Sequence, residues 1–206
     1  MTATKGELTR ERIVASAASL FNRRGYAGAS MTDLMAAAGL EKGGVYRHFD
    51  SKQAIATAAF DHAAKLHGDR IRAHLAVAPP DAASRMVAVA AGMASIAVDP
   101  PIPGGCPLLN TAIESDDADG DVYPALRARA KHGMRRLLGT IEKIVAEGVV
   151  SGEFRPDANA RVEASGVVSM MEGALMLTKL NDDPAHLAWA VERVRERARQ
   201  LSVAER

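Results

Sequence analysis

One stretch near the N-terminus decides the fold: Ala38-Gly39-Leu40-Glu41-Lys42-Gly43-Gly44-Val45-Tyr46-Arg47-His48-Phe49-Asp50-Ser51-Lys52. It predicts a short helix over 42–49, with Val45 and Phe49 on one side. A glycine inside a helix costs about 0.8–1 kcal/mol relative to alanine. Two successive glycines, Gly43 and Gly44, therefore indicate that this backbone comes close to another surface, although a loosened loop would also accept them.

The polar residues of this stretch suit an anionic partner. A recognition helix places its N-terminal residues in the major groove of DNA, about 12 Å wide, where small residues permit close approach. Tyr46 and His48 have short, stiff side chains that could donate to phosphate oxygens, and Lys52 begins the next helix, where backbone N–H groups favour an anion. Taken singly, each of these three side chains could equally serve surface packing.

Two helices are predicted before this stretch. Ile13, Ala17 and Phe21 form the apolar face of a helix from about Thr9 that ends at Gly25. Ser30, followed by Asp33 three residues later, has the form of a helix start, and this second helix ends at Gly39. The order is helix, turn, short helix, after which Ser51 caps a longer helix reaching about Leu75.

Residues 9–55 resemble the N-terminal DNA-binding domain of the TetR family of transcriptional regulators. The resemblance rests on Ala38-Gly39-Leu40, on Lys42 to Phe49 and on Lys52, which match the glycine-ended second helix, the short third helix and the Tyr-x-His-Phe-x-x-Lys ending of the family. It implies double-stranded DNA as a partner and a helix-turn-helix domain over 1–52. It also implies a helical effector-binding and dimerisation domain over 53–206.

The resemblance assigns DNA-contacting roles residue by residue. We expect Lys42 and Arg47 to read bases, because Gly43 and Gly44 leave few side chains there to do so. The residues expected mainly to hold the DNA backbone are Thr32, Tyr46, His48 and Lys52. Glu41 departs from the family, which commonly has Ser or Thr there, and glutamate is a poorer helix cap.

The remaining sequence predicts only helices, so the fold class is all-α with about nine helices. Pro79-Pro80 and the segment 99–105 interrupt the pattern, and Pro124 opens a further helix. From Val162 to Leu180 the chain is apolar almost all round, which favours burial on several sides, with a second subunit supplying cover. The last helix begins at Asp183-Pro184. The residues expected at a dimer interface are Val168, Leu175, Leu187, Val191 and Val194.

Composition sets the broad class. The chain has 206 residues, 48% hydrophobic and 25% charged, as in soluble globular proteins. No apolar run reaches the length of a membrane span and the N-terminus is polar, so we expect a cytoplasmic protein without a membrane partner. Eight basic and five acidic residues fall within 1–52, although the whole chain has a net charge of only +1. This asymmetry agrees with an anion-binding N-terminus.

A small-molecule effector of unknown identity is implied by the resemblance, with no cofactor and no metal. The residues expected to line its pocket are His67, Met86, Met93, Cys106, Asn110, Met134 and Met171. Cys106 could instead be a nucleophile or a redox sensor, although a lone cysteine in an apolar stretch is usually a small buried hydrophobe. The segment 115–120 resembles the start of a calcium loop but has Leu126 where that loop needs glutamate, so we interpret it as a solvated acidic linker.

The sequence thus predicts a homodimeric, ligand-responsive repressor that binds a pseudo-palindromic operator and is released by its effector. Two alternatives stay open: a small helical enzyme using Cys106, and a helical interaction module. The sequence has no Gly-x-Ser-x-Gly, His-Glu-x-x-His or Walker motif, which disfavours the common enzyme classes. Only the regulator requires salt-dependent binding to duplex DNA.

Overall fold

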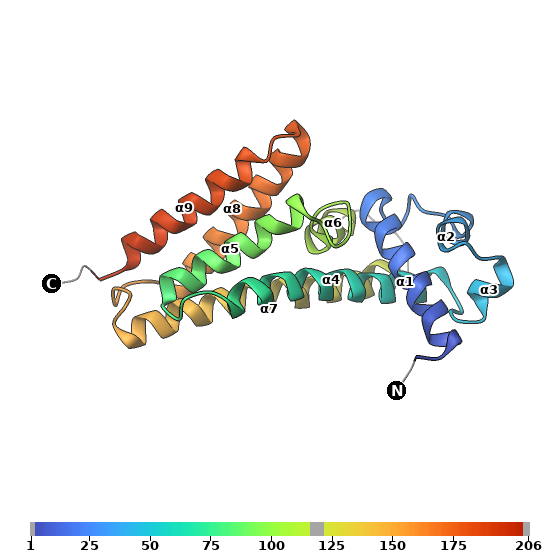
Figure 1. The fold of residues 1–206 in the computed structure, drawn as a ribbon, viewed down its shortest axis with the longest axis horizontal. Coiled ribbons are helices and arrows are strands. Elements are labelled where there is room, and N and C mark those ends of the chain that lie inside the picture. Colours follow the sequence, from blue (N-terminus) through green and yellow to red (C-terminus); the bar gives the residue numbers. More distant parts are fainter. Residues whose placement is uncertain (1–2, 116–121, 204–206) are drawn as a thin grey trace. The chain divides into compact units, whose positions relative to one another are not determined.

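The computed structural model describes residues 3–115 and 122–203, which form nine α-helices and no β-sheet. This confirms the all-α prediction. The helices are α1 (Lys5–Arg24), α2 (Met31–Ala38), α3 (Lys42–Tyr46), α4 (Lys52–Ala76), α5 (Ala82–Val98), α6 (Pro107–Glu114), α7 (Val122–Ser151), α8 (Ala160–Asn181) and α9 (Ala185–Leu201) (Figure 1). No helix in the described ranges is both long enough and apolar enough to span a membrane.

Helix α1 begins at Lys5, earlier than the start near Thr9 that its apolar pattern predicts. Thr4 and Glu7 form a capping box: Thr4 Oγ1 accepts from the Glu7 N–H at 3.2 Å, and the Glu7 carboxylate accepts from the Thr4 N–H at 2.7 Å. The box satisfies N–H groups that an exposed first turn would otherwise leave to water. The first turn is therefore fixed by capping and not by burial.

The chain divides into two compact units. The first comprises Met1–Leu66 and Pro101–His132, and the second comprises His67–Pro100 and Gly133–Arg206. Helices α4 and α7 each contribute their first part to the first unit and their second part to the second. These units are structural, and the functional boundary predicted between residues 52 and 53 stays a prediction.

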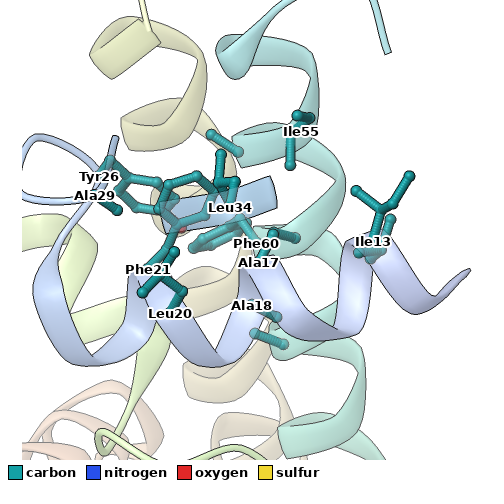
Figure 2. Packing of buried hydrophobic residues seen from close by; sticks show 14 of the residues in the cluster. Ile13, Ala17, Ala18, Leu20, Phe21, Tyr26, Ala29, Leu34, Ile55 and Phe60 are labelled. Carbon is teal, nitrogen blue, oxygen red and sulfur yellow. The ribbon is translucent and has the colours of Figure 1, made fainter. Parts of the chain in front are cut away.

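The core of the first unit joins α1, α2, α3 and α4. Ile13, Phe21, Leu34 and Phe60 point into one apolar cluster (Figure 2). Ile102, in the loop before α6, is also part of this cluster, as are Leu126 and Ala130 of α7. The helix-turn-helix thus shares its core with residues about 100 positions further along the chain.

The core of the second unit is built on α5, α8 and α9, which run side by side (Figure 1). Met86 and Val89 of α5 pack in one cluster with Met171 of α8 and Val194 of α9. Arg197 donates to the Glu163 carboxylate, with Nε 2.8 Å from Oε2, and so ties α9 to α8. Replacing either partner would leave the other charge partly buried without its counterion.

Candidate nucleic-acid interface

The inner side of α3 is fixed by two apolar residues. Val45 is fully buried and Phe49, just after the helix, is nearly so, and both belong to the core of the first unit. The guanidinium of Arg10 on α1 lies over the face of the Phe49 ring, 4.8 Å from its centroid, in a cation–π contact. A helix of five residues is not stable by itself, so α3 is held in place by the side chains packed around it.

The outer side of α3 carries most of the residues predicted to contact DNA. Lys42, Gly43, Tyr46 and Arg47 are all exposed, and Thr32 is exposed on α2. The ammonium group of Lys42 lies 5.9 Å from the centroid of the Tyr46 ring, one turn away. One surface of the first unit thus carries the cations of Lys42 and Arg47, the Tyr46 phenol and Gly43.

The two glycines of α3 differ in their surroundings. A Cβ atom added to Gly44 would lie 3.4 Å from Cδ2 of Leu40, an ordinary contact, whereas one added to Gly43 would meet nothing within 4 Å. Neither glycine has a positive φ angle. Nothing within the first unit therefore requires glycine at position 43.

The helix ends around this surface follow the predicted capping pattern. The Ser30 hydroxyl accepts from the Asp33 N–H at 3.1 Å, the Asp33 carboxylate accepts from the Ser30 N–H at 2.8 Å, and Gly39 ends α2 in the left-handed region with φ 62°. Glu41 precedes α3 without a side-chain hydrogen bond to it, as expected of a glutamate there. Ser51 caps α4 through the Ala54 N–H at 3.1 Å.

Lys52 and His48 lie at the margin of this surface. Both are half-buried, and the Lys52 ammonium donates to the Tyr26 carbonyl in the loop between α1 and α2. An ammonium group has three donors, so this bond leaves capacity for a phosphate oxygen. Lys52 therefore also fastens the start of α4 to the turn between α1 and α2, a role that its sequence position did not suggest.

A second set of bonds ties α6 to α1. The Glu114 carboxylate accepts from the N–H groups of Tyr26 and Ala27 at 3.0 and 2.9 Å. The Asn110 amide donates to Oδ1 of Asn22 and to the Gly104 carbonyl, both at 3.0 Å. We call these bonds the α1–α6 junction. It fixes α6 to the helix-turn-helix within the first unit.

The residues predicted to line an effector pocket are divided between the two units. His67, Met86, Met93, Met134 and Met171 belong to the second unit, whereas Cys106 and Asn110 belong to the first. The amide nitrogen of Asn110 donates to Asn22 and Gly104 in the α1–α6 junction, and its place in a pocket stays a prediction. Cys106 is buried at the start of α6.

Three of the five residues predicted at a dimer interface are covered by their own chain. Val168, Leu187 and Val194 are buried in the core of the second unit, and Leu175 and Val191 are partly buried against it. A residue already covered within one chain adds little new buried area when a second subunit binds. The other face of α8 is exposed within a single chain, and its burial by a second subunit stays a prediction.

That exposed face of α8 is apolar. Val162, Met170, Leu177 and Leu180 are exposed at intervals of three to eight residues, and no atom lies within 4 Å of a Cβ built on the intervening Gly166 or Gly173. On α9, Trp189 is 60% exposed. We call the α8 residues at 162, 166, 170, 173, 177 and 180 the α8 stripe.

Other predictions concern metals and the acidic linker. Among the described residues no group of three or more His, Cys, Asp or Glu side chains could hold a metal ion. The calcium-like segment 115–120 lies, apart from Ser115, outside the residues that the structure describes.

Several functional candidates escaped prediction from the sequence. Glu114 and Asn22 carry no local motif, because their partners are about 88 positions away. The residues of the α8 stripe recur at helical spacing in the sequence. The opposite face of α8 is equally apolar, so the spacing alone does not distinguish the exposed face from the buried one.

Comparison with known proteins identifies the helix-turn-helix. Residues 13–59 match the family model of bacterial regulatory proteins of the tetR family, and residues 82–194 match the tetracyclin repressor-like C-terminal domain. The structure is similar to that of a TetR transcriptional regulator from Chloroflexus aurantiacus, with a TM-score of 0.90, 42% identity, and coverage of 96% of this chain and 98% of that one.

Two further relatives are similar over most of their length. A TetR-family regulator from Cytophaga hutchinsonii has a TM-score of 0.87 and 30% identity, with both chains fully covered. An uncharacterised HTH-type transcriptional regulator of Lactococcus lactis is 24% identical over 181 residues, 85% of each chain.

Proposed function

The chain belongs to the TetR family of transcriptional regulators, and we propose that it is a repressor that binds a pseudo-palindromic operator as a homodimer and leaves it when a small molecule binds. DNA binding and transcriptional regulation follow from membership of the family. The sign of regulation, the dimer, the effector and the contact residues are the proposal.

The exposed side of α3 is the observation that carries the proposal. Lys42 and Arg47 offer donors suited to guanine O6 and N7, while Tyr46 and Thr32 offer hydroxyls suited to phosphate oxygens. Gly43, which nothing in its own unit requires, would let the backbone approach the duplex. Lys52 and His48 would add phosphate contacts at the margin.

The α8 stripe supports the homodimer. Exposed apolar patches of this kind on soluble proteins mark interaction sites, and a twofold axis lets one stripe cover its copy. Gly166 and Gly173 would let two α8 helices approach closely, with Leu177 and Leu180 burying most of the apolar area. This stripe replaces Val168, Leu187 and Val194 as the proposed contact surface.

The effector would bind in the second unit, where four of the predicted pocket residues are methionines. It would favour a conformation of the dimer whose two recognition helices no longer fit the operator. An effector shifts such a balance only by its difference in affinity for the two states, and moving 1:99 to 99:1 takes about 5.5 kcal/mol. The proposed activity is regulation without catalysis.

A reporter assay tests the proposal. The operator obtained by selection is placed between a promoter and a reporter gene in a host that lacks this protein. We expect expression of the chain to lower reporter output, the Arg47→Ala variant to restore it, and a member of a diverse compound library to relieve repression. Activation of the reporter would contradict the proposal that the chain is a repressor. Repression that no compound relieves would contradict the proposal that an effector releases it.

A further inference from the structure

A buried histidine in the second unit has no hydrogen-bond partner on either ring nitrogen. His67 on α4 is 6% exposed, and neither Nδ1 nor Nε2 contacts a donor or acceptor within the described structure. A buried polar group without a partner destabilises the folded chain, because it loses its hydrogen bonds to water and gains none in return. Most such groups in native proteins are satisfied, so each exception requires an explanation. One such explanation is a ligand that supplies the missing hydrogen-bond partner.

The ring of His67 is uncharged at neutral pH. Burial lowers its pKa from 6.5 to about 4, because a desolvated imidazolium is unfavourable. A neutral imidazole has one nitrogen that donates and one that accepts. The site therefore offers one hydrogen bond of each kind and no charge from this residue.

The surroundings of His67 follow from the way α4 approaches α5. The two helices come very close at Gly92, where an added Cβ would lie 2.8 Å from Cα of Ile71. The connection between them is short, so they run antiparallel. His67 lies one turn before Ile71 on the same face of α4, which brings it level with the turn of α5 between Met93 and Ile96. Both of those side chains are buried and apolar.

The charged neighbours are already paired. Arg70, one turn after His67, donates to the carboxylate of Asp99 at 2.6 Å and to its carbonyl at 2.8 Å. Within the second unit the buried acids are Glu163, which is paired with Arg197, and Glu172 on α8. Arg72 is likewise paired with Asp69, so an anionic ligand at His67 would find no unpaired arginine on the following turns of α4.

Aromatic rings are scarce in this unit. Over residues 67–100 and 133–203 they are Phe154, which is buried, and Trp189, which is mostly exposed. Quaternary ammonium ligands are recognised by cages of aromatic faces. The described second unit has too few rings near His67 to build one.

We propose that His67 is the hydrogen-bonding residue of the effector site and that the effector is an uncharged organic molecule with an apolar body and a hydroxyl, phenol or carbonyl group. This inference rests on the proposed function and names the chemical class of its effector. Met86, Met93 and Met171 lie in the core cluster of the same unit, and their flexible, polarisable side chains would let this core repack around an apolar body.

Three probes with one apolar body test the class: 4-propylphenol, 4-propylbenzoate and trimethyl(4-propylphenyl)ammonium. Each is titrated into the full chain while the ring signals of the histidines are followed by NMR. We expect the phenol to shift the His67 signals and to bind at least tenfold more tightly than the two ions. Tightest binding of the ammonium probe would show that the site prefers a cation and would overturn the proposal. The absence of any shift at His67 across the probes and a library of several hundred uncharged fragments would also overturn it.

Variants separate a ligand contact from a structural histidine. His67→Leu removes both ring nitrogens but keeps an apolar side chain, and His74→Leu changes a half-buried histidine on the same helix as a control. We expect His67→Leu to keep or raise the Tm at pH 7 and to weaken phenol binding at least tenfold, with His74→Leu binding unchanged. A marked fall in Tm for His67→Leu, with phenol binding retained, would show that the ring serves the fold.

The operator provides the last control, because it separates this inference from the proposed function. If another compound releases the protein from its operator with equal potency in wild type and His67→Leu, the effector proposal stands and the role of His67 fails. If no compound alters operator affinity, the effector proposal itself fails.

Discussion

No contact within the described part of its own chain requires glycine at position 43, whereas close approach of a DNA duplex would. Replacing it with alanine places a methyl group in open space and removes the backbone entropy cost of glycine. We expect Gly43→Ala to raise the free energy of unfolding by up to about 1 kcal/mol and to weaken operator binding at least tenfold. Urea denaturation and fluorescence anisotropy measure the two effects.

The matched control for this prediction is Gly139→Ala on α7, a second glycine with nothing within 4 Å of its added Cβ. It should gain stability and bind the operator as wild type does. If Gly43→Ala bound the operator normally, close approach of the duplex at this position would be ruled out.

His67 gives the chain a stability that depends on pH. Its pKa is about 4 in the folded chain and 6.5 when unperturbed, so between these values the unfolded chain binds the extra proton. Stability should therefore fall as the pH falls through this window, by about 3 kcal/mol for the full shift. Above pH 6.5 the contribution is fully present.

Urea denaturation of wild type and His67→Leu between pH 7.5 and 4 measures this effect. The two stabilities should diverge on acidification, with the wild type losing more, while His74→Leu follows the wild type. Parallel profiles for wild type and His67→Leu would mean that His67 titrates in the folded chain as it does in the unfolded one.

At the scale of elements, the α1–α6 junction holds the turn after α1 in place. Glu114→Gln keeps the shape of the side chain but sets an amide group against one of the two backbone N–H donors of Tyr26 and Ala27. We expect a loss of about 1–3 kcal/mol in unfolding free energy, measured by urea denaturation. The exposed Glu11→Gln serves as control, and equal stability of the two variants would refute the structural role of the junction.

The helices themselves were largely predictable because their signals are local. Ser30 with Asp33, Gly39, and the apolar spacing of Ile13 to Phe21 all act within a few residues, and each predicted a helix that the structure contains. The apolar pattern places the start of α1 too late, because the first turn is fixed by the Thr4–Glu7 capping box. The sequence contains this capping signal, since Thr4 is followed by Glu7 three residues later.

The candidate site was less predictable because its contacts are distant in sequence. The apolar spacing within Lys42 to Phe49 placed Val45 and Phe49 on one side, and the structure buries both. No local signal could show that Asn110 bonds to Asn22, or which face of α8 its own chain covers. Such facts depend on packing between helices, which a single sequence does not record.

At the scale of the whole molecule, the α8 stripe should decide the oligomeric state. Leu177→Arg places a charge within the proposed interface, where an unpaired buried charge is strongly unfavourable. We expect this variant to sediment as a monomer at concentrations where the wild type is a dimer, and to lose most of its operator affinity.

Val150→Arg on α7 is the control for this change, since Val150 is also an exposed apolar residue but lies outside the stripe. It should sediment as the wild type does. Dimers of unchanged stability in Leu177→Arg, with Val150→Arg also dimeric, would place the interface elsewhere.

The most direct test of the account is selection of binding sites from randomised duplex DNA by the 206-residue chain, followed by affinity measurements over a salt series. The account predicts a pseudo-palindromic site with half-sites about 34–36 Å apart, or a multiple of that spacing, and an affinity whose logarithm falls linearly with the logarithm of the salt concentration. Failure of a folded dimer to enrich any site, or enrichment of a single half-site bound by one subunit, would contradict a dimeric regulator that reads DNA through α3.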